Sequence, residues 1–450
     1  MYSISLKNIE NTFDYEELIK VFLRRDEFVI FDCGDLVFNE DNEDDKNAIK
    51  REIYLKLKEI TGYVPPWGIL TGVRPVKLAH EYYNICNDYD LTKKHFLEYY
   101  LLSNEKADLL IDTLKMQKDN LEDSNSKSVS IYIGIPFCPT RCAYCSFTSN
   151  QKPDSEIRRY LEALKKEITF VSSGIKEKGL IIESIYIGGG TPTTLNDEEL
   201  NDLLSFIFKS FPLKDLKEFT VEAGRPDTIT KSKLEIIKSY GIERISINPQ
   251  TMNDKTLKLI GRNHSSDEII SAFKLAREVG INIVNCDLIM GLPGENIDDF
   301  NFTLDEIFKL NPENITVHTL AVKRTSKIYE EDIYYSYRER DVAKSMVDIS
   351  NFRLKEMGYN PYYLYRQKNM SGSFENVGWC RDKSISIYNI RIMDEHEHIL
   401  ALGAGGMSKI YFKEENRHER IPNVSNYEVY IDRIDEMIDR KRKQFFDELK

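Results

Sequence analysis

The chain of 450 residues is 41% hydrophobic and 30% charged, and its formal net charge is −12 at pH 7. This length allows two or three domains, and the negative charge argues against a protein that coats nucleic acid or an anionic membrane. No apolar run approaches the roughly 20 residues of an integral membrane span. No signal peptide is recognisable, and the seven cysteines do not resemble a secreted disulfide framework, so we expect a cytoplasmic protein.

The first part of the chain shows the helical spacing of apolar residues. This spacing is clearest over residues 16–25, 47–60 and 98–117, and a polar, serine-rich segment at 121–130 ends this part. We expect residues 1–125 to form a mostly helical N-terminal accessory domain.

Between residues 126 and 325, short apolar runs alternate with stretches of helical spacing. Six such βα-type units predict an α/β core, with a parallel sheet and helices packed outside it. The sheet is expected either to open as a doubly wound fold or to curl into a barrel or part-barrel, and both folds place their chemistry at the C-terminal ends of the strands. The strand candidates are residues 129–135, 182–188, 218–223, 244–250, 281–291 and 313–320. Helices are expected at residues 157–171, 197–211, 233–241, 266–280 and 298–311.

The alternation of strands and helices fades beyond residue 325. Residues 334–358 predict one long helix, and a tyrosine-rich segment with short strands follows. We expect residues 326–450 to form a C-terminal α+β region that binds the substrate.

Three cysteines lie within eight residues, directly after the first predicted strand: Cys138, Cys142 and Cys145, spaced C-x3-C-x2-C. Thiolates are the usual ligands of iron–sulfur clusters, and three of them leave one iron of a [4Fe–4S] cluster open. The alternatives are a zinc site with a distant fourth ligand, or cysteines that only pack. No cysteine or histidine follows within ten residues to complete a zinc tetrahedron, which favours the cluster. Packing is the expected role of Cys33, Cys86, Cys286 and Cys380.

The triplet, with Tyr144 before its last cysteine, resembles the signature of radical S-adenosylmethionine (SAM) enzymes. IGGGTPT (187–193) resembles the glycine-rich turn of that family, where bare backbone approaches the methionine amine of the cofactor. The resemblance implies a partial (β/α)6 barrel. It also implies that SAM chelates the open iron, and that an electron passed through the cluster cleaves SAM to a 5′-deoxyadenosyl radical.

The order of the motifs resembles the oxygen-independent coproporphyrinogen III oxidase (coproporphyrinogen dehydrogenase) group. From residue 130 to 325 the motifs are Tyr132 with IPFC, GGGTPT, TVEA, RIS-x3-Q, GRNH and DLIMGLPGE, and the flanks at 65–80 and 365–380 look like the HemZ branch. The resemblance implies the oxidative decarboxylation of two propionates of coproporphyrinogen III to vinyl groups, giving protoporphyrinogen IX for haem. It also implies a flavodoxin- or ferredoxin-type electron donor.

The same resemblance assigns roles to individual residues. Cys138, Cys142 and Cys145 would bind the cluster, and no catalytic residue is assigned. Contacts to one or two SAM molecules would come from Tyr132, Tyr144, Gly189, Gly190, Thr191, Glu222, Gln250, Arg262 and Asp287. The alternative for the four polar residues from Glu222 onward is a solvated strand end or an ion pair.

Several positions depart from the pattern of the group. Phe147 stands where close oxidase relatives carry a further cysteine, Gly134 stands where histidine is usual, and Arg225 lengthens the turn after Glu222. Phe147 is what haem-chaperone relatives show. A haem-binding trafficking protein and radical alkylation of another tetrapyrrole therefore remain alternatives.

The region from Tyr359 to Arg391 combines aromatic and basic residues, which suits a flat ligand that carries carboxylates. A tyrosine-rich strand pair with its charges on the solvent face is the alternative. His318 is expected to be a hydrogen-bonded core histidine, and His396 and His398 are expected to be exposed, with haem ligation as their alternative. Substrate contacts are expected from Arg366, Lys368, Trp379 and Arg391.

Overall fold

We describe the fold from a computed structural model. The structure describes residues 1–7, 12–31, 34–39, 46–72, 74–122, 124–145, 150–322, 326, 328, 330, 332, 335, 339–367 and 374–449. Cys33, Phe147 and Lys368, which the sequence analysis singled out, lie outside these residues.

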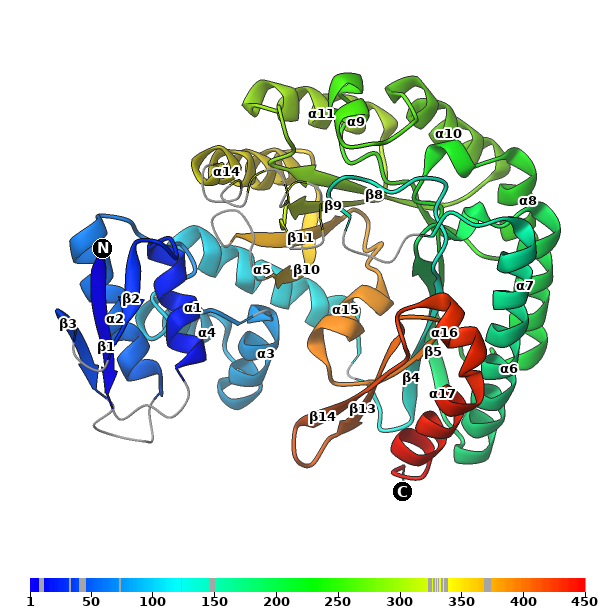
Figure 1. Ribbon diagram of the computed structural model, residues 1–450, viewed down its shortest axis with the longest axis horizontal. Helices are drawn as coiled ribbons and strands as arrows, with labels where there is room; N and C mark the ends of the chain where they lie inside the picture. The colour runs from blue at the N-terminus through cyan, green and yellow to red at the C-terminus, as the bar shows by residue number, and fades with distance from the viewer. Residues whose placement is uncertain are drawn as a thin grey trace.

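Six parallel strands form the centre of a strongly curved sheet, and helices cover its convex face (Figure 1). The strands are β4 (Ser128–Ile135), β5 (Ile181–Gly189), β6 (Glu218–Glu222), β7 (Arg244–Ser246), β8 (Ile283–Met290) and β9 (Asn314–Thr319). The helices are α6 (Asp154–Lys178), α7 (Asp197–Ser210), α8 (Lys231–Ser239), α9 (Asp254–Leu259), α10 (Ser266–Val279) and α11 (Ile297–Leu310). The six predicted strands and the predicted part-barrel are confirmed.

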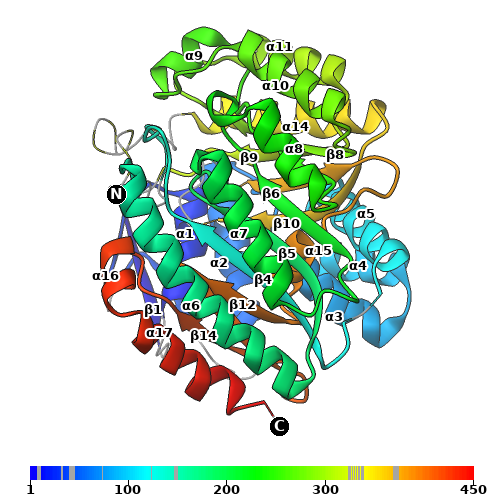
Figure 2. The ribbon, with the colours of Figure 1, turned by 90° about the vertical axis from the view of Figure 1, so that its right-hand side faces the viewer.

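The helices begin where the sequence supplies caps. At α7 and α10, the side chains of Asn196 and Ser265 accept from the backbone N–H three residues on. The side chain of the glutamate at that position accepts in turn from the backbone N–H of the cap residue. At the C-terminal end, Gly179 and Gly280 end α6 and α10 in the left-handed conformation. Figure 2 shows α6, α7 and α8 lying side by side across the sheet.

The fourth strand is shorter than the sequence predicts. Residues 244–250 were expected to be extended, but β7 ends at Ser246. Pro249 has no N–H to donate to a neighbouring strand, which interrupts the pairing. Gln250 then returns to the sheet as a single bridge to Leu288, with a φ of 70°.

The C-terminal region extends the same sheet at both edges. At one edge β11 pairs antiparallel with β9, and β10 follows it; at the other edge β12 pairs parallel with β4, and β13 and β14 follow. Residues from both ends of this region thus share one sheet with the barrel, and the division of the chain at residue 325 stays a prediction. The elements are α14 (Arg340–Glu356), β10 (Asn360–Arg366), β11 (Glu375–Cys380), α15 (Ile387–Asp394), β12 (His398–Leu402), β13 (Met407–Phe412), β14 (Arg417–Pro422), α16 (Tyr427–Asp432) and α17 (Ile434–Lys441).

The N-terminal region is mostly helical but contains a small parallel sheet that was not predicted, in the order β2-β1-β3. The predicted helix over residues 98–117 begins only at Asn104, because Ser103 caps α5 and α4 ends before it. The elements are β1 (Tyr2–Lys7), α1 (Phe13–Phe22), β2 (Phe28–Ile30), β3 (Leu36–Asn39), α2 (Lys46–Thr61), α3 (Pro75–Cys86), α4 (Tyr89–Glu98) and α5 (Asn104–Asn120).

Helices α3 and α5 pack on β10 and share the core of the barrel. The buried Glu375 joins the two parts, since it accepts from Trp67 Nε1 (2.7 Å) and from Lys106 Nζ (2.5 Å). Among the described helices, none is both long enough and apolar enough to span a membrane.

Candidate active site

The concave face of the sheet carries a row of partly accessible residues. On β4 the strand is buried except at Tyr132, on β6 except at Glu222, and on β9 except at His318. Parallel register sets Tyr132 opposite Tyr186 of β5, whose ring lies 6.3 Å from it. Tyr388 of α15 stacks on Tyr186 at 4.7 Å, so that α15 packs against this face.

Glu222 lies at the carboxyl end of β6 and accepts a hydrogen bond from Tyr186 Oη (2.5 Å). Burial raises the pKa of this carboxyl to about 7, and the nearby Asp287 also raises it. Gly188 makes room for Glu222, because a Cβ there would lie 2.9 Å from its carboxylate. A carboxyl group with a perturbed pKa at the functional edge of an α/β sheet is typical of a binding or catalytic site.

Asp287 lies on the same face, 3.8 Å from His318 Nε2, and accepts from Asn285 Nδ2 (2.8 Å). Burial alone would raise its pKa, but hydrogen bonds from His318 and Asn285 outweigh burial and lower it. His318 Nδ1 lies 3.2 Å from Tyr365 Oη. His318 was expected in the core; its side chain is hydrogen-bonded but 25% exposed on the concave face.

The cysteine loop follows the carboxyl end of β4. Cys138 Sγ lies 3.5 Å from Thr191 Oγ1, and Cys138 N donates to Asn150 O (3.1 Å). Burial raises the pKa of Cys138 to about 11, and the neighbouring thiols Cys145 and Cys142 contribute. Cys145 N donates to Cys142 O (3.1 Å), so the second and third cysteines lie on one tight turn of this loop.

The glycine-rich turn packs directly on this loop. Thr191 N donates to Phe137 O (2.7 Å), and a Cβ on Gly190 would lie 2.4 Å from the same oxygen. Only glycine at position 190 allows the two backbones to approach in this way.

Several buried acceptors near the end of β7 have no hydrogen-bond partner among the described residues. They are Ser246 Oγ, Asn248 Oδ1 and Gln250 Oε1. Gln250 also has a left-handed backbone, which costs free energy in a residue other than glycine. Unmet buried acceptors and a strained backbone together indicate a place where a polar ligand donates hydrogen bonds.

Two guanidinium groups flank Cys142. Arg262 donates to Asn248 O (2.6 Å) and to Tyr144 Oη (3.0 Å), and Arg225 Nη1 lies 3.7 Å from Cys142 Sγ. Burial would lower the pKa of Arg262, but Tyr144 and Cys142 outweigh burial and raise it. Sequence reasoning noted Arg225 only as part of a longer turn and missed its contact with the cysteine loop.

Comparisons with known proteins agree with this geometry. The pattern of the Radical SAM superfamily matches residues 132–307. Over 404 residues the chain is 41% identical to the oxygen-independent coproporphyrinogen-III oxidase-like protein HemZ of Bacillus subtilis (strain 168), and the match covers 88% of this chain and 80% of that protein. The chain belongs to the radical SAM superfamily and, within it, to the HemZ-like group.

This radical SAM protein is also similar to a second curated relative and to a solved structure. The heme chaperone HemW of Bacillus subtilis (strain 168) is 36% identical over 203 residues, which cover 44% of this chain and 52% of HemW, so the chain spans about half the length of that relative. The structure of coproporphyrinogen III oxidase (HemN) from Escherichia coli has a TM-score of 0.54 at 22% identity over 70% of each chain, which shows a shared fold.

Radical SAM proteins use a [4Fe–4S] cluster and SAM, and the residues of this site fit both. Cys138, Cys142 and Cys145 supply three thiols on one loop, and the unmet acceptors near β7 suit the amine and hydroxyl donors of SAM. In the described ranges no three His, Cys, Asp or Glu side chains converge on a position for a single metal ion. A [4Fe–4S] cluster differs from such an ion, because each cysteine binds a different iron atom.

The residues expected from the sequence to contact SAM lie on β4, β5, β6 and β8 of the radical SAM sheet or on the loops that follow its strands. Tyr132 Oη lies 3.3 Å from the position that a Cβ on Gly189 would occupy. Tyr144 lies beside Arg262 and packs on Ile260 and its neighbours. Further along the same edge, Gln250 N donates to Asp287 O (2.9 Å), and Asp287 is near enough to Glu222 to raise its pKa.

The residues expected to bind the substrate do not join this row. Arg366 donates to Leu70 O and lies over the ring of Trp67 at 5.3 Å, and burial lowers its pKa to about 10. Trp379 is fully buried in the main core. Arg391 pairs with Glu183 (2.7 Å) and Glu397 (2.8 Å) inside the protein. Lys368 lies outside the described residues.

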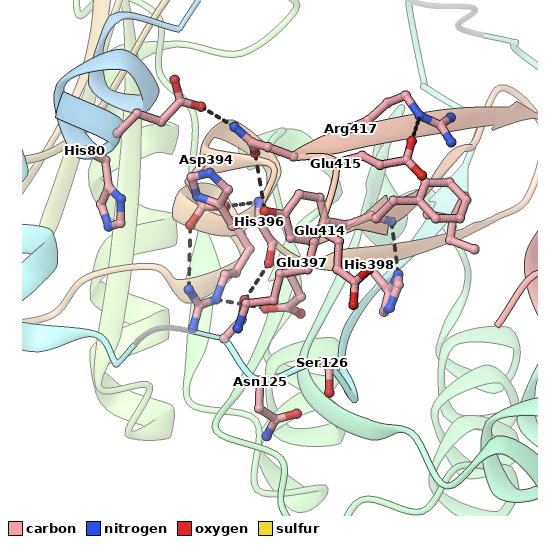
Figure 3. A pocket seen from close by; sticks show the side chains of 18 of the residues that line it. His80, Asn125, Ser126, Asp394, His396, Glu397, His398, Glu414, Glu415 and Arg417 are labelled. Atoms are coloured by element: carbon pink, nitrogen blue, oxygen red, sulfur yellow. Dashed lines mark hydrogen bonds and ion pairs between the residues drawn. The ribbon is translucent and has the colours of Figure 1, made fainter. Parts of the chain in front are cut away.

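A cavity of about 850 Å³ lies near the opposite ends of the strands, between α3 and the β13–β14 hairpin (Figure 3). His80 and His396 both line it, and their rings lie close together, with centroids 5.5 Å apart and planes tilted by 42°. His398 was expected to be exposed, and this was wrong: it is 6% exposed, and its Nδ1 accepts from Tyr411 N (3.1 Å). Residues 124–126, which precede β4, line the same cavity, so it is far from the cysteine loop.

Proposed function

We propose that the protein is a radical SAM coproporphyrinogen dehydrogenase, which converts two propionates of coproporphyrinogen III to vinyl groups without oxygen. The observation that carries this proposal is the shared edge of the sheet: the cysteine loop, the glycine-rich turn and the accessible row Glu222, Asp287 and His318 all lie there. The identity with a HemZ protein over most of both chains supports the same reaction. Cytoplasmic location and a flavodoxin- or ferredoxin-type donor are part of this proposal.

The residues of the concave face divide between two tasks. When bound, the cluster and SAM supply the radical that removes a hydrogen from the substrate. Glu222 and Gln250 are positioned to accept hydrogen bonds from SAM, and Arg262 to pair with its carboxylate. Tyr365 Oη lies 3.2 Å from His318 Nδ1 at the far side of the row. If His318 donates to this oxygen, the Tyr365 hydroxyl is left to donate to a propionate carboxylate.

Anaerobic turnover tests the proposal. Protein with a reconstituted cluster, dithionite, SAM and coproporphyrinogen III should yield 5′-deoxyadenosine together with a tetrapyrrole that has lost two CO2. Tyr365→Phe should reduce tetrapyrrole conversion about 10-fold or more, because it removes the hydroxyl that would donate to a propionate, and a hydrogen bond to a charged group is worth about 1.5–3 kcal/mol. Cleavage of SAM without substrate should persist in this variant. Deoxyadenosine with an unchanged tetrapyrrole mass would refute the assigned substrate.

Haem trafficking is the second candidate, and the 850 Å³ cavity favours it. Its volume suits a cofactor-sized ligand, and His80 or His396 would supply an axial ligand to a haem iron. Similarity to the heme chaperone HemW supports the same role. In a haem titration monitored by absorbance, His396→Ala should weaken binding at least 10-fold, whereas His95→Ala, in α4 outside the cavity, should leave it unchanged. Equal binding by all three proteins would exclude this site.

A further inference from the structure

A buried guanidinium group lies against the cysteine loop in addition to the residues already assigned to SAM. Arg225, between β6 and the short helix Pro226–Thr228, is 3% exposed. Its Nη1 donates to Thr140 Oγ1 (3.0 Å) and to Cys142 Sγ (3.7 Å). Thus a positive charge, largely shielded from water, lies next to one of the three cluster ligands.

Asp227 fixes the direction in which this charge acts. Its two oxygens accept from Arg225 Nε (3.0 Å) and Nη2 (2.9 Å), a bidentate pairing that leaves Nη1 directed at the loop. The positive end of the pair therefore faces Cys142, and the negative end lies behind it. Asp227 is itself 3.6 Å from the buried His264 Nδ1.

The surrounding turn holds the pair in place. Arg225 O accepts from Thr228 N (3.0 Å) and from Thr228 Oγ1 (2.8 Å). Thr228 Oγ1 also lies 2.7 Å from Thr193 Oγ1 in the glycine-rich turn. The backbone of Arg225 is thus anchored to its own turn and, through Thr228, to the turn that packs on the cysteine loop.

Charges and hydrogen bonds near the sulfurs set the reduction potential of an iron–sulfur cluster. Reduction adds one negative charge to the cluster, so a positive charge nearby stabilises the reduced state, and the effect is stronger where water is excluded. We propose that Arg225 is a positioning residue that raises the reduction potential of the cluster through Cys142, and that Asp227 limits this effect. The proposal depends on the cluster but not on the tetrapyrrole substrate.

Redox titration of the reconstituted protein, monitored by electron paramagnetic resonance without SAM or tetrapyrrole, tests this role. Arg225→Gln should lower the equilibrium constant for one-electron reduction about 10-fold or more, which is about 59 mV. Asp227→Asn should shift the potential in the opposite direction, because it removes the opposing charge. Arg225→Lys, which keeps the charge, should stay close to the wild type.

Arg277→Gln is the control, since Arg277 Nη2 pairs with both oxygens of Glu313 (3.0 Å each) just before β9, at the end of the sheet away from the cysteine loop. It should leave the potential unchanged. A wild-type potential in Arg225→Gln with full iron content would overturn the proposal. If Arg225→Gln does not assemble a cluster, Asp227→Asn decides, and an unchanged or lower potential there overturns it. An absence of tetrapyrrole turnover would refute the proposed function but would leave these potentials measurable.

Discussion

Cys142→Ala should abolish cluster assembly and SAM cleavage together. The three thiols lie on one short loop and are the only protein ligands assigned to the cluster, so the loss of one leaves an iron without its protein ligand. Iron and sulfide analysis, the absorbance of the reconstituted protein and the yield of 5′-deoxyadenosine measure the effect. We expect all three signals to fall to background.

Cys86→Ala is the control for a cysteine elsewhere in the chain. Its sulfur lies at the end of α3, within 3.4 Å of Thr92 Oγ1, far along the chain from the cysteine loop. This variant should keep the iron content and SAM cleavage of the wild type. A Cys142→Ala protein that still held four irons and cleaved SAM would disprove the assignment of the loop.

The pattern of the core was predictable from the sequence because short, mostly buried apolar runs alternate with stretches of helical spacing. The end of β7 was not predicted, since the apolar run continues through Ile247 while Pro249 breaks the pairing. The three strands of the N-terminal sheet are only three to six residues long and pair across helices, so their local pattern is weak.

The edge of the site was also predictable, because the carboxyl ends of parallel strands meet there. The positions of the residues expected to bind the substrate were not predictable, since composition does not tell which face of a strand a side chain occupies. Side chains alternate along β10, so Tyr365 faces His318 while its neighbour Arg366 faces Trp67. Glu375, a partner of Trp67, comes from the adjacent strand, and only the tertiary structure reveals that contact.

Glu222→Gln should weaken SAM binding and, at the same time, change how the stability of the apo protein depends on pH. We propose that the Glu222 carboxylate accepts a hydrogen bond from SAM, and a hydrogen bond to a charged group is worth about 1.5–3 kcal/mol, or about 10- to 100-fold in affinity. Calorimetry with SAM at pH 8, where the carboxyl is ionised, measures this loss. Gln keeps an acceptor for Tyr186 Oη, so the fold of the strand end should be retained.

The pH effect follows from the raised pKa of Glu222. Burial lifts this pKa from 4.5 to about 7, so the folded protein keeps the proton at pH values where the unfolded chain has lost it. The free energy of unfolding of the wild type should therefore fall as pH rises from 4.5 to 7, by about 2 kcal/mol after allowance for partial exposure. Gln does not titrate. The unfolding midpoint of Glu222→Gln should therefore rise relative to that of the wild type as the pH increases from 5 to 8. A difference that is constant over this range would show that Glu222 is not held in its protonated form by burial.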